Sequence, residues 1–275
     1  MRSGLGPLAI VLALLAGPAA SQAISPDVMV PAPQPADWAA IGELPDLSGT
    51  WLPDLGNQRS QEQGPDAPPW NPEVRKQVDH WFAEENAGRP KGLLVNCLPH
   101  GMPSLMLITH NALEFLVTPG RVTILGESEG SRLRRIHTDG RAMPAAPDPS
   151  FDGYSVGRWN NGVLEVDTTA ILPQVYLAVS EAVGIPNNGG MTIHERIHLI
   201  EPDTLADDLE ITAPKILTRT WKTRRLYHRT RQRLAEIQEG VCRQGDFAEG
   251  TDPYGNAIYV PANTTEDGNL LPPSQ

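Results

Sequence analysis

The chain has 275 residues, enough for one large domain or two small ones. Its formal net charge of −11 disfavours nucleic-acid binding, which needs clustered Lys and Arg, so we expect no nucleic-acid partner. The 27 Pro and 25 Gly favour many turns and short strands over a helical bundle.

The first 23 residues have the pattern of a secretory signal peptide. Arg2 precedes the apolar run Leu5–Leu15, which at about 11 residues fits the hydrophobic part of such a signal. The small residues Ser21 and Ala23 fit cleavage after Ala23. No later apolar run approaches the roughly 20 residues of a membrane helix. We therefore expect a periplasmic or secreted protein without stable membrane insertion.

The remaining chain is expected to hold one domain, over residues 47–250. Residues 24–46 are rich in Pro and Ala and are expected to be extended, and the polar residues 251–275 are expected to form a loose tail. In an oxidising compartment Cys97 and Cys242 can form one disulfide. The chain-entropy relation gives a loop of this length roughly 5 kcal/mol. The alternative is a pair of unpaired, buried thiols.

A helix is predicted to begin at Asn71, which can serve as an N-cap before Pro72, and to end at Gly88. Its apolar residues share one face, so the helix should pack against a sheet. They are Val74, Val78, Trp81 and Phe82.

From residue 113 onward the sequence predicts strands. Pro119-Gly120 and Asn161-Gly162 mark hairpin turns between them. Regularly spaced short strands indicate an all-β fold, which we expect to be a lipocalin-like antiparallel β-barrel with one helix outside it. The predicted strands are 113–118, 121–127, 132–138, 153–159, 163–169, 191–200, 209–212 and 221–230.

Residues 194–198 read HERIH and match the zinc motif H-E-x-x-H. On a helix His194 and His198 would be neighbours, whereas on a strand they lie about 13 Å apart and cannot share a zinc ion. The segment is rich in β-branched residues, and its polar and apolar residues alternate, which favours a strand. We therefore expect no metal site, and a zinc hydrolase is kept only as an alternative.

As a strand, this segment places Glu195 on an apolar face with Ile193, Ile197 and Leu199. A buried carboxylate must be paired or hydrogen-bonded, or its pKa rises. One interpretation is an ion pair with an Arg of a neighbouring strand, and Arg134 or Arg135 could supply it.

The functional interpretation makes Glu195 a general acid or base in a pocket. Tyr154, His137 or Arg135 would then be its electrophilic partner in catalysis.

Residues 153–157 match the serine-hydrolase motif G-x-S-x-G, and Asp167 and His194 follow Ser155 in the matching order. A nucleophile elbow needs a strand, a turn and then a helix, but here a second strand follows. We therefore expect Ser155 to be an ordinary strand residue.

Aromatic residues are candidates for contacts with a substrate. Trp221 and Tyr227 share a strand face with Arg225, either as an amphipathic exterior or as the lining of a pocket. Trp159 and His100 are further candidates; the simpler interpretation of His100 is a solvated loop residue.

The chain resembles a large, sparsely characterised family of secreted proteobacterial proteins. The resemblance implies a β-rich fold and export but no settled activity. Because Glu-Arg stands in that family without flanking histidines, it also weakens the zinc interpretation. Tyr154, Asn187-Asn188-Gly189 and Ala213 depart from the family's pattern. The matching segments are 46–51 (DLSGTW), 97–103 (CLPHGMP), 134–141 (RRIHTDGR), 153–159 (GYSVGRW), 164–168 (LEVDT), Glu195-Arg196 and Cys242.

Such barrels hold apolar small molecules in their interior, and three functions follow from this. The first is a cofactor-independent enzyme acting by acid–base chemistry, as a lyase, isomerase or hydrolase, on a hydrophobic molecule of aromatic or terpenoid type. The second is a non-catalytic binding protein for a hydrophobic ligand. The third is the zinc hydrolase. The sequence leaves the substrate and the oligomeric state open.

Overall fold

The structure, a computed structural model, describes residues 31–90, 93, 98–108, 112–127, 132–238, 247–251 and 257–261. The chain divides into two compact units, residues 1–34 and 35–275, and all described helices and strands belong to the second. None of the described helices is long and apolar enough to cross a lipid bilayer.

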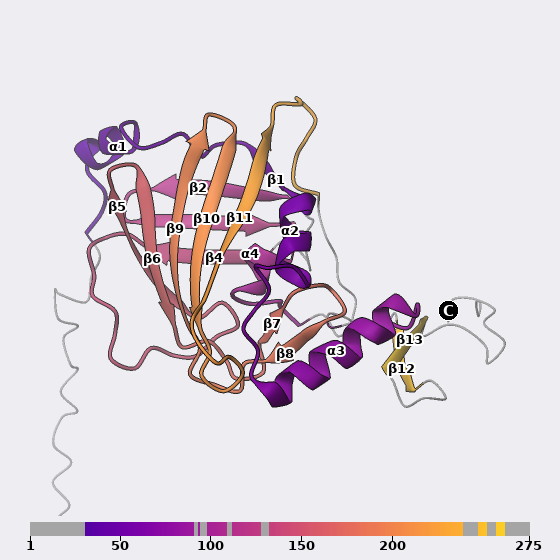
Figure 1. The fold of residues 1–275 in the computed structure, drawn as a ribbon. Coiled ribbons are helices and arrows are strands. Elements are labelled where there is room, and N and C mark those ends of the chain that lie inside the picture. Colours follow the sequence, from indigo (N-terminus) through magenta and orange to yellow (C-terminus); the bar gives the residue numbers. More distant parts are fainter. Residues whose placement is uncertain are drawn as a thin grey trace, which may run out of the picture. The chain divides into compact units, whose positions relative to one another are not determined.

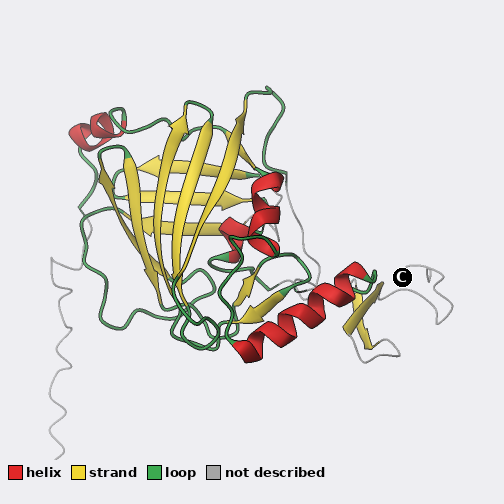
Figure 2. Cartoon of the chain, in the orientation of Figure 1, coloured by secondary structure: helices red, strands yellow, loops and turns green. Residues whose placement is uncertain are grey.

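Nine strands close into one barrel (Figures 1 and 2), in the order β1-β11-β10-β9-β6-β5-β4-β3-β2. All neighbours are antiparallel except β4 and β5, which pair in parallel. The expected all-β, lipocalin-like barrel is therefore confirmed, with one parallel pair as the exception. The strands are β1 (Thr50–Pro53), β2 (Leu113–Thr118), β3 (Arg121–Gly126), β4 (Arg132–His137), β5 (Tyr154–Asn160), β6 (Val163–Thr169), β9 (Thr192–Glu201), β10 (Thr204–Thr212) and β11 (Trp221–Thr230).

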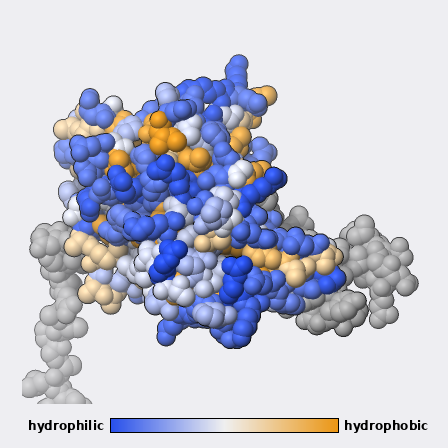
Figure 3. All heavy atoms as spheres, in the orientation of Figure 1, coloured by the Kyte–Doolittle hydropathy of each residue, from blue (hydrophilic) through white to orange (hydrophobic). Residues whose placement is uncertain are grey.

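Two layers of strands enclose the barrel interior. In Figure 1 the strands β5, β6, β9, β10 and β11 lie side by side in front, and β2 and β4 cross behind them. Each strand sends every second side chain inward. The face of the molecule seen in Figure 3 is mainly hydrophilic, as expected for the outward-facing side chains. The predicted turns join β2 to β3 and β5 to β6, and Asn161 has the positive φ, 48°, that a primed turn needs.

The structure has four described helices where the sequence predicted one. The predicted helix is α3 (Pro72–Asn86), capped by the side chain of Asn71, which accepts from the backbone N–H groups of Glu73 and Val74. Its buried residues include Val74, Val78 and Phe82, as expected from the pattern. The others are α1 (Pro35–Ile41), α2 (Leu55–Glu62) and α4 (Ser104–Leu107).

Two small hairpins lie outside the barrel sheet. They are β7 (Tyr176–Ala178) with β8 (Gly184–Pro186), and β12 (Phe247–Thr251) with β13 (Ala257–Pro261). The second hairpin reaches into the segment that was expected to be a loose tail. The helix α1 likewise lies in the segment that was expected to be extended.

The loop before α4 enters the core. Met102 and the four residues of α4 are all buried. Gly101 has a φ of +66°, and a Cβ there would stand 2.4 Å from the Phe151 carbonyl oxygen, so only glycine fits this turn. Gly101 is therefore required by both conformation and space.

The helix α2 continues the barrel wall beside β11. The strand β1 pairs only with the second half of β11, from residue 227 onward. Beside the first half, Gln61 of α2 donates to the Thr223 hydroxyl (2.6 Å) and to the Arg224 carbonyl (2.9 Å), and Asn57 accepts from the Leu226 N–H. At this seam, side-chain hydrogen bonds therefore replace a β-ladder.

Candidate functional site

Glu195 on β9 points into the barrel and forms a buried ion pair with Arg134 on β4. The Arg134 Nη1 donates to Glu195 Oε1 at 2.8 Å, and its Nη2 donates to Oε2. Both side chains are 0% exposed. Burial alone would lower the pKa of Arg134, but the charge of Glu195 outweighs it and the pKa is raised. The predicted strand is confirmed, and the ion-pair interpretation of Glu195 is correct in the kind of partner, but Arg134 comes from across the barrel and not from a neighbouring strand.

Two hydroxyl groups complete the surroundings of this guanidinium. Thr168 on β6 accepts from Arg134 Nη2 at 3.1 Å, and Ser155 on β5 accepts at 3.4 Å. The two hydroxyls also bond each other at 2.8 Å, since Ser155 and Thr168 are cross-strand partners. Four strands are thus joined through one buried arginine.

Asp207 on β10 is the second carboxyl inside the barrel. It is fully buried, and neither of its carboxyl oxygens has a hydrogen-bond partner. Burial raises its pKa well above the usual value, and the charge of Glu195 raises it further, against the opposing effect of Arg134. Once protonated, Asp207 stands close enough to Glu195 to share its proton with it. Among the described residues, this cluster therefore holds the paired carboxylate of Glu195 and a second carboxyl, Asp207, that keeps at least one oxygen without a partner.

The sequence analysis missed Asp207, although the sequence carries a signal for it. Leu205, Asp207, Leu209 and Ile211 alternate along β10 and all are buried. This is the pattern that identified Glu195 on β9. The predicted strand began at residue 209, so the alternation through Asp207 was not seen.

A second buried cation, Arg225 on β11, is directed toward α2. Its guanidinium donates to the Asp54 carbonyl (2.9 Å) and to Gln58 Oε1 (2.8 Å). Burial lowers its pKa. Tyr227 donates its hydroxyl to the Met106 carbonyl, and burial raises the pKa of this phenol. These two residues fasten α2 and α4 to the barrel.

The aromatic candidates fall into two groups. Trp221 and Tyr227 are buried with Arg225, so the exterior interpretation of this strand face is wrong, and Trp221 donates to the Asp66 carbonyl at 2.7 Å. Trp159 is half-buried on the inward row of β5. His100 is buried in the loop before α4 and is not a solvated residue.

Three of the four proposed catalytic residues lie on the outer face of the barrel. The ring of His137 stacks on that of Tyr154 at 5.1 Å between centroids, and Arg141 donates to the Tyr154 hydroxyl at 3.0 Å. Burial, followed by the charge of Arg141, lowers the pKa of His137. Arg135 is exposed. The structure therefore does not bring these three residues together with the inward-facing Glu195.

The H-E-x-x-H segment lies on the strand β9, with both histidines facing outward. His194 Nδ1 lies 2.8 Å from Asp167 Oδ1, and His198 Nδ1 lies 3.2 Å from the Arg196 carbonyl. Among the described residues, no group of three or more His, Cys, Asp or Glu is arranged to hold a metal ion. The helix that a zinc site requires is absent at this segment.

The G-x-S-x-G match has a structural explanation. Ser155 faces inward, whereas Asp167 and His194 face outward, so no triad forms. Gly153 has a φ of +70°. A Cβ at Gly157 would stand 2.7 Å from Ile136 Cγ2. Both glycines are thus explained by backbone conformation and close packing.

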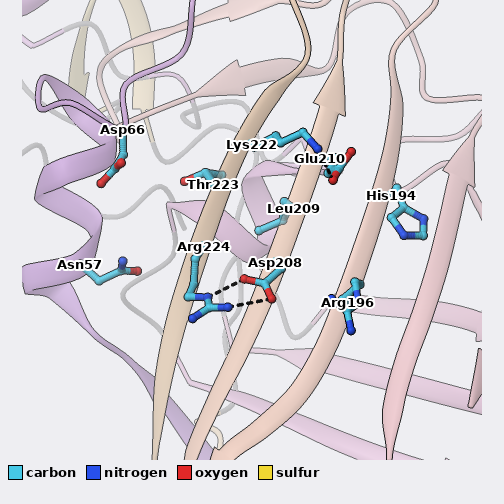
Figure 4. Close-up of a pocket in the computed structure, with 10 residues that line it drawn as sticks. All are labelled: Asn57, Asp66, His194, Arg196, Asp208, Leu209, Glu210, Lys222, Thr223 and Arg224. Carbon is cyan, nitrogen blue, oxygen red and sulfur yellow. Dashed lines mark hydrogen bonds and ion pairs between the residues drawn. The ribbon is translucent and has the colours of Figure 1, made fainter. Parts of the chain in front are cut away.

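An outer groove of about 490 Å³ borders the seam at α2 (Figure 4). Four of its charged residues form two pairs: Lys222 with Glu210 at 2.6 Å, and Arg224 with both oxygens of Asp208. Such surface pairs contribute little stability. The groove is lined by Asn57, Asp66, His194, Arg196, Asp208, Leu209, Glu210, Lys222, Thr223 and Arg224.

Comparisons with known proteins add little to this description. No family model and no curated protein matches the chain. Among solved structures, a REP1-NXSQ fatty acid transporter is similar at 10% identity and a TM-score of 0.32, over 68% of this chain and 98% of that one. The fold assignment therefore rests on the strand topology itself.

The predicted disulfide between Cys97 and Cys242 lies outside the described residues.

Proposed function

We propose that this protein binds a small, largely apolar molecule inside its barrel and does not transform it. The observation that carries the proposal is Asp207, a fully buried carboxyl with two unbonded oxygens. Leaving such a group unpaired costs about 1–3 kcal/mol, so its presence calls for an explanation. A ligand that supplies the missing hydrogen bond is the simplest one.

The composition of the interior fits an amphipathic ligand. Around the polar cluster the inward rows are apolar, and Glu195 itself is flanked across the ladders by Val166 and Leu209. Small-molecule sites combine mostly apolar walls with a few placed polar groups. Barrels of about eight strands have an interior that holds at most one small ligand.

We place the entrance at the seam between α2 and β11. Side-chain hydrogen bonds of Gln61 and Asn57, not a ladder, close the wall there. The outer groove borders the same seam and includes Leu209 and Thr223, which belong to the inward rows of β10 and β11. Opening at this seam separates α2 from β11 and leaves the ladder between β10 and β11 in place.

The test is to look for the ligand itself. The protein is purified from its native compartment without detergent and examined by native mass spectrometry and by solvent extraction. We expect one bound small molecule per chain, and displacement of the neutral fluorophore N-phenyl-1-naphthylamine by the extract. A chain that carries no adduct and does not bind the fluorophore would contradict the proposal.

A second candidate is an enzyme acting by acid–base chemistry. The specific observation in its favour is the proximity of Glu195, paired with Arg134, to Asp207, whose pKa is raised. Neighbouring carboxyl groups in different environments are a recurring acid–base arrangement. The extracted ligand is incubated with wild-type protein and with Asp207→Asn. Conversion by the wild type alone supports catalysis, and an unchanged ligand removes it.

We further propose that the protein is exported, as a relative of the secreted proteobacterial family that its motifs resemble. The support is the Arg2 and Leu5–Leu15 signal pattern. Cell fractionation with N-terminal sequencing tests it, and the expected mature chain begins at Ile24. A cytosolic chain that keeps Met1 or begins at Arg2 would contradict export.

A further inference from the structure

We infer that the ligand carries a neutral hydroxyl group, which hydrogen-bonds to Asp207 on the inner face of β10. This inference rests on the proposed binding function and specifies the chemistry of the ligand. It follows from the groups that the buried cluster leaves unsatisfied.

The cluster offers both acceptors and a donor. The two oxygens of Asp207 lack donors, and the Nε–H of Arg134 lacks an acceptor. Even when Asp207 shares a proton with Glu195, its second oxygen stays without a partner. A hydroxyl group both donates and accepts, so it matches the character of this cluster.

The other polar groups nearby are already engaged. Arg134 holds both oxygens of Glu195 through its two terminal nitrogens. Ser155 and Thr168 bond each other and Arg134. Of the described residues that form this cluster, Asp207 keeps both oxygens, and Arg134 its Nε–H, without a hydrogen-bond partner.

A carboxylate ligand does not suit this cluster. It would stand beside Glu195, whose negative charge repels it in a medium of low dielectric. Arg134 is the cation that opposes the raised pKa of Asp207, and Glu195 already neutralises it. The second buried cation, Arg225, is directed toward the Asp54 carbonyl and Gln58.

An ammonium ligand is also a poorer match than an alcohol. Burial and the charge of Glu195 raise the pKa of Asp207, which favours its neutral form, and a neutral carboxyl gives little compensation for burying a cation. Desolvating an ammonium costs far more than desolvating a hydroxyl. The neutral alcohol is thus the group that leaves no charge unpaired.

The test compares three probes of equal chain length: decan-1-ol, decylamine and decanoate. Each probe is titrated at neutral pH into full-length protein that has been incubated with N-phenyl-1-naphthylamine, and the loss of fluorescence gives the affinity of the probe. We expect decan-1-ol to bind more tightly than either charged probe by at least about tenfold, because sites built around a hydroxyl strongly reject analogues without one.

Two substitutions of Asp207 sharpen the result. Asp207→Leu should abolish the preference for the alcohol, and Asp207→Asn, which keeps one acceptor and a donor, should keep part of it. The matched control is Asp167→Leu, which changes an exposed carboxylate on the outer row of β6 that does not line the groove, and should leave the preference unchanged.

The possible outcomes separate the two proposals. A preference for decanoate or decylamine, equal binding of all three, or a preference that survives Asp207→Leu overturns the hydroxyl inference and leaves the binding function standing. Failure of the fluorophore and of every probe to bind overturns both. The ranking of the three probes on the wild-type protein tests the hydroxyl inference even if a variant does not fold.

Discussion

Arg134 and Glu195 are joined by a two-point ion pair in which neither side chain is exposed, although 61 residues separate them in the sequence. The strands β4 and β9 that carry them are not neighbours, because β5 and β6 stand between them in the barrel wall. The pair therefore spans the interior and not a ladder. The contact therefore connects β4 directly to β9 across the interior.

Removing one partner of this pair should be strongly destabilising. Glu195→Gln leaves the Arg134 charge buried without its counter-ion, which costs about 3–5 kcal/mol. Replacing both residues, with Arg134→Met and Glu195→Leu, should restore most of the loss, since apolar replacements of buried pairs are often neutral or better. Urea unfolding followed by tryptophan fluorescence measures both variants.

The surface pair of Arg158 with Glu165 gives the matched control for that experiment. The Arg158 side chain is 68% exposed and that of Glu165 is 14% exposed, so water screens this pair and Glu165→Gln should cost clearly less than Glu195→Gln. If Glu195→Gln lowered the free energy of unfolding no more than Glu165→Gln does, the pair of Arg134 with Glu195 would not stabilise the fold.

Local patterns in the sequence predicted most of the barrel. Alternation on β9, the turn at Asn161-Gly162 and the cap at Asn71 are each set by neighbouring residues, and all three are confirmed. The short helices α2 and α4 were missed, because tertiary contacts and not helix propensity hold them. Gln61 of α2, for example, is fixed by Thr223 and Arg224, more than 160 positions away.

The candidate site was predicted only in part, for a related reason. Alternation placed Glu195 inside, but the choice between Arg134 and Arg135 depended on the register of another strand. His137 and Tyr154 were grouped with Glu195 on chemical type alone, and their strand positions turn them outward. Which residues meet inside a closed barrel depends on strand order, and the sequence does not display that order.

Substituting Gly157 should reveal that the G-x-S-x-G match is structural. In Gly157→Ala the new Cβ meets Ile136 at 2.7 Å, and such overpacking costs about 1–3 kcal/mol. Gly88→Ala is the control for conformation without crowding: its φ is +74°, but no atom lies within 4 Å, so the cost should be about 1 kcal/mol. Thermal unfolding ranks the two variants. Equal melting temperatures would show that the space at Gly157 is not limiting.

The outward-facing histidines should not confer zinc binding. We expect protein purified without chelators to contain less than about a tenth of an equivalent of zinc, because His194 and His198 are too far apart on a strand to share the ion. Elemental analysis measures the content, and His194→Gln with His198→Gln should leave it unchanged. Stoichiometric zinc that disappears in this double variant would restore the hydrolase interpretation.

The two cysteines should be oxidised in the exported protein. Cys97 and Cys242 are expected to form one bridge, so the unreduced protein should show no titratable thiol after unfolding in guanidinium. Reduction should then release two thiols and lower the free energy of unfolding by about 2–5 kcal/mol. Two reactive thiols before reduction would indicate unpaired cysteines.

Asp207 should make the protein less stable as the pH rises. The pKa of this carboxyl is raised in the folded state, so between about pH 4 and that raised value the folded protein binds more protons than the unfolded chain. Stability falls across this window by up to about 1.4 kcal/mol per pH unit.

Asp207→Asn removes the titration and should stabilise the protein at neutral pH by about 1–3 kcal/mol, with a smaller gain near pH 4. Urea unfolding over a series of pH values measures the difference. The matched control is Asp167→Asn, which removes a 58% exposed partner of His194 on the outer face and should cost at most about 1 kcal/mol. A gain for Asp207→Asn that does not grow with pH would mean that Asp207 is ionised and satisfied in the folded protein, which would also remove the main support for a ligand at this position.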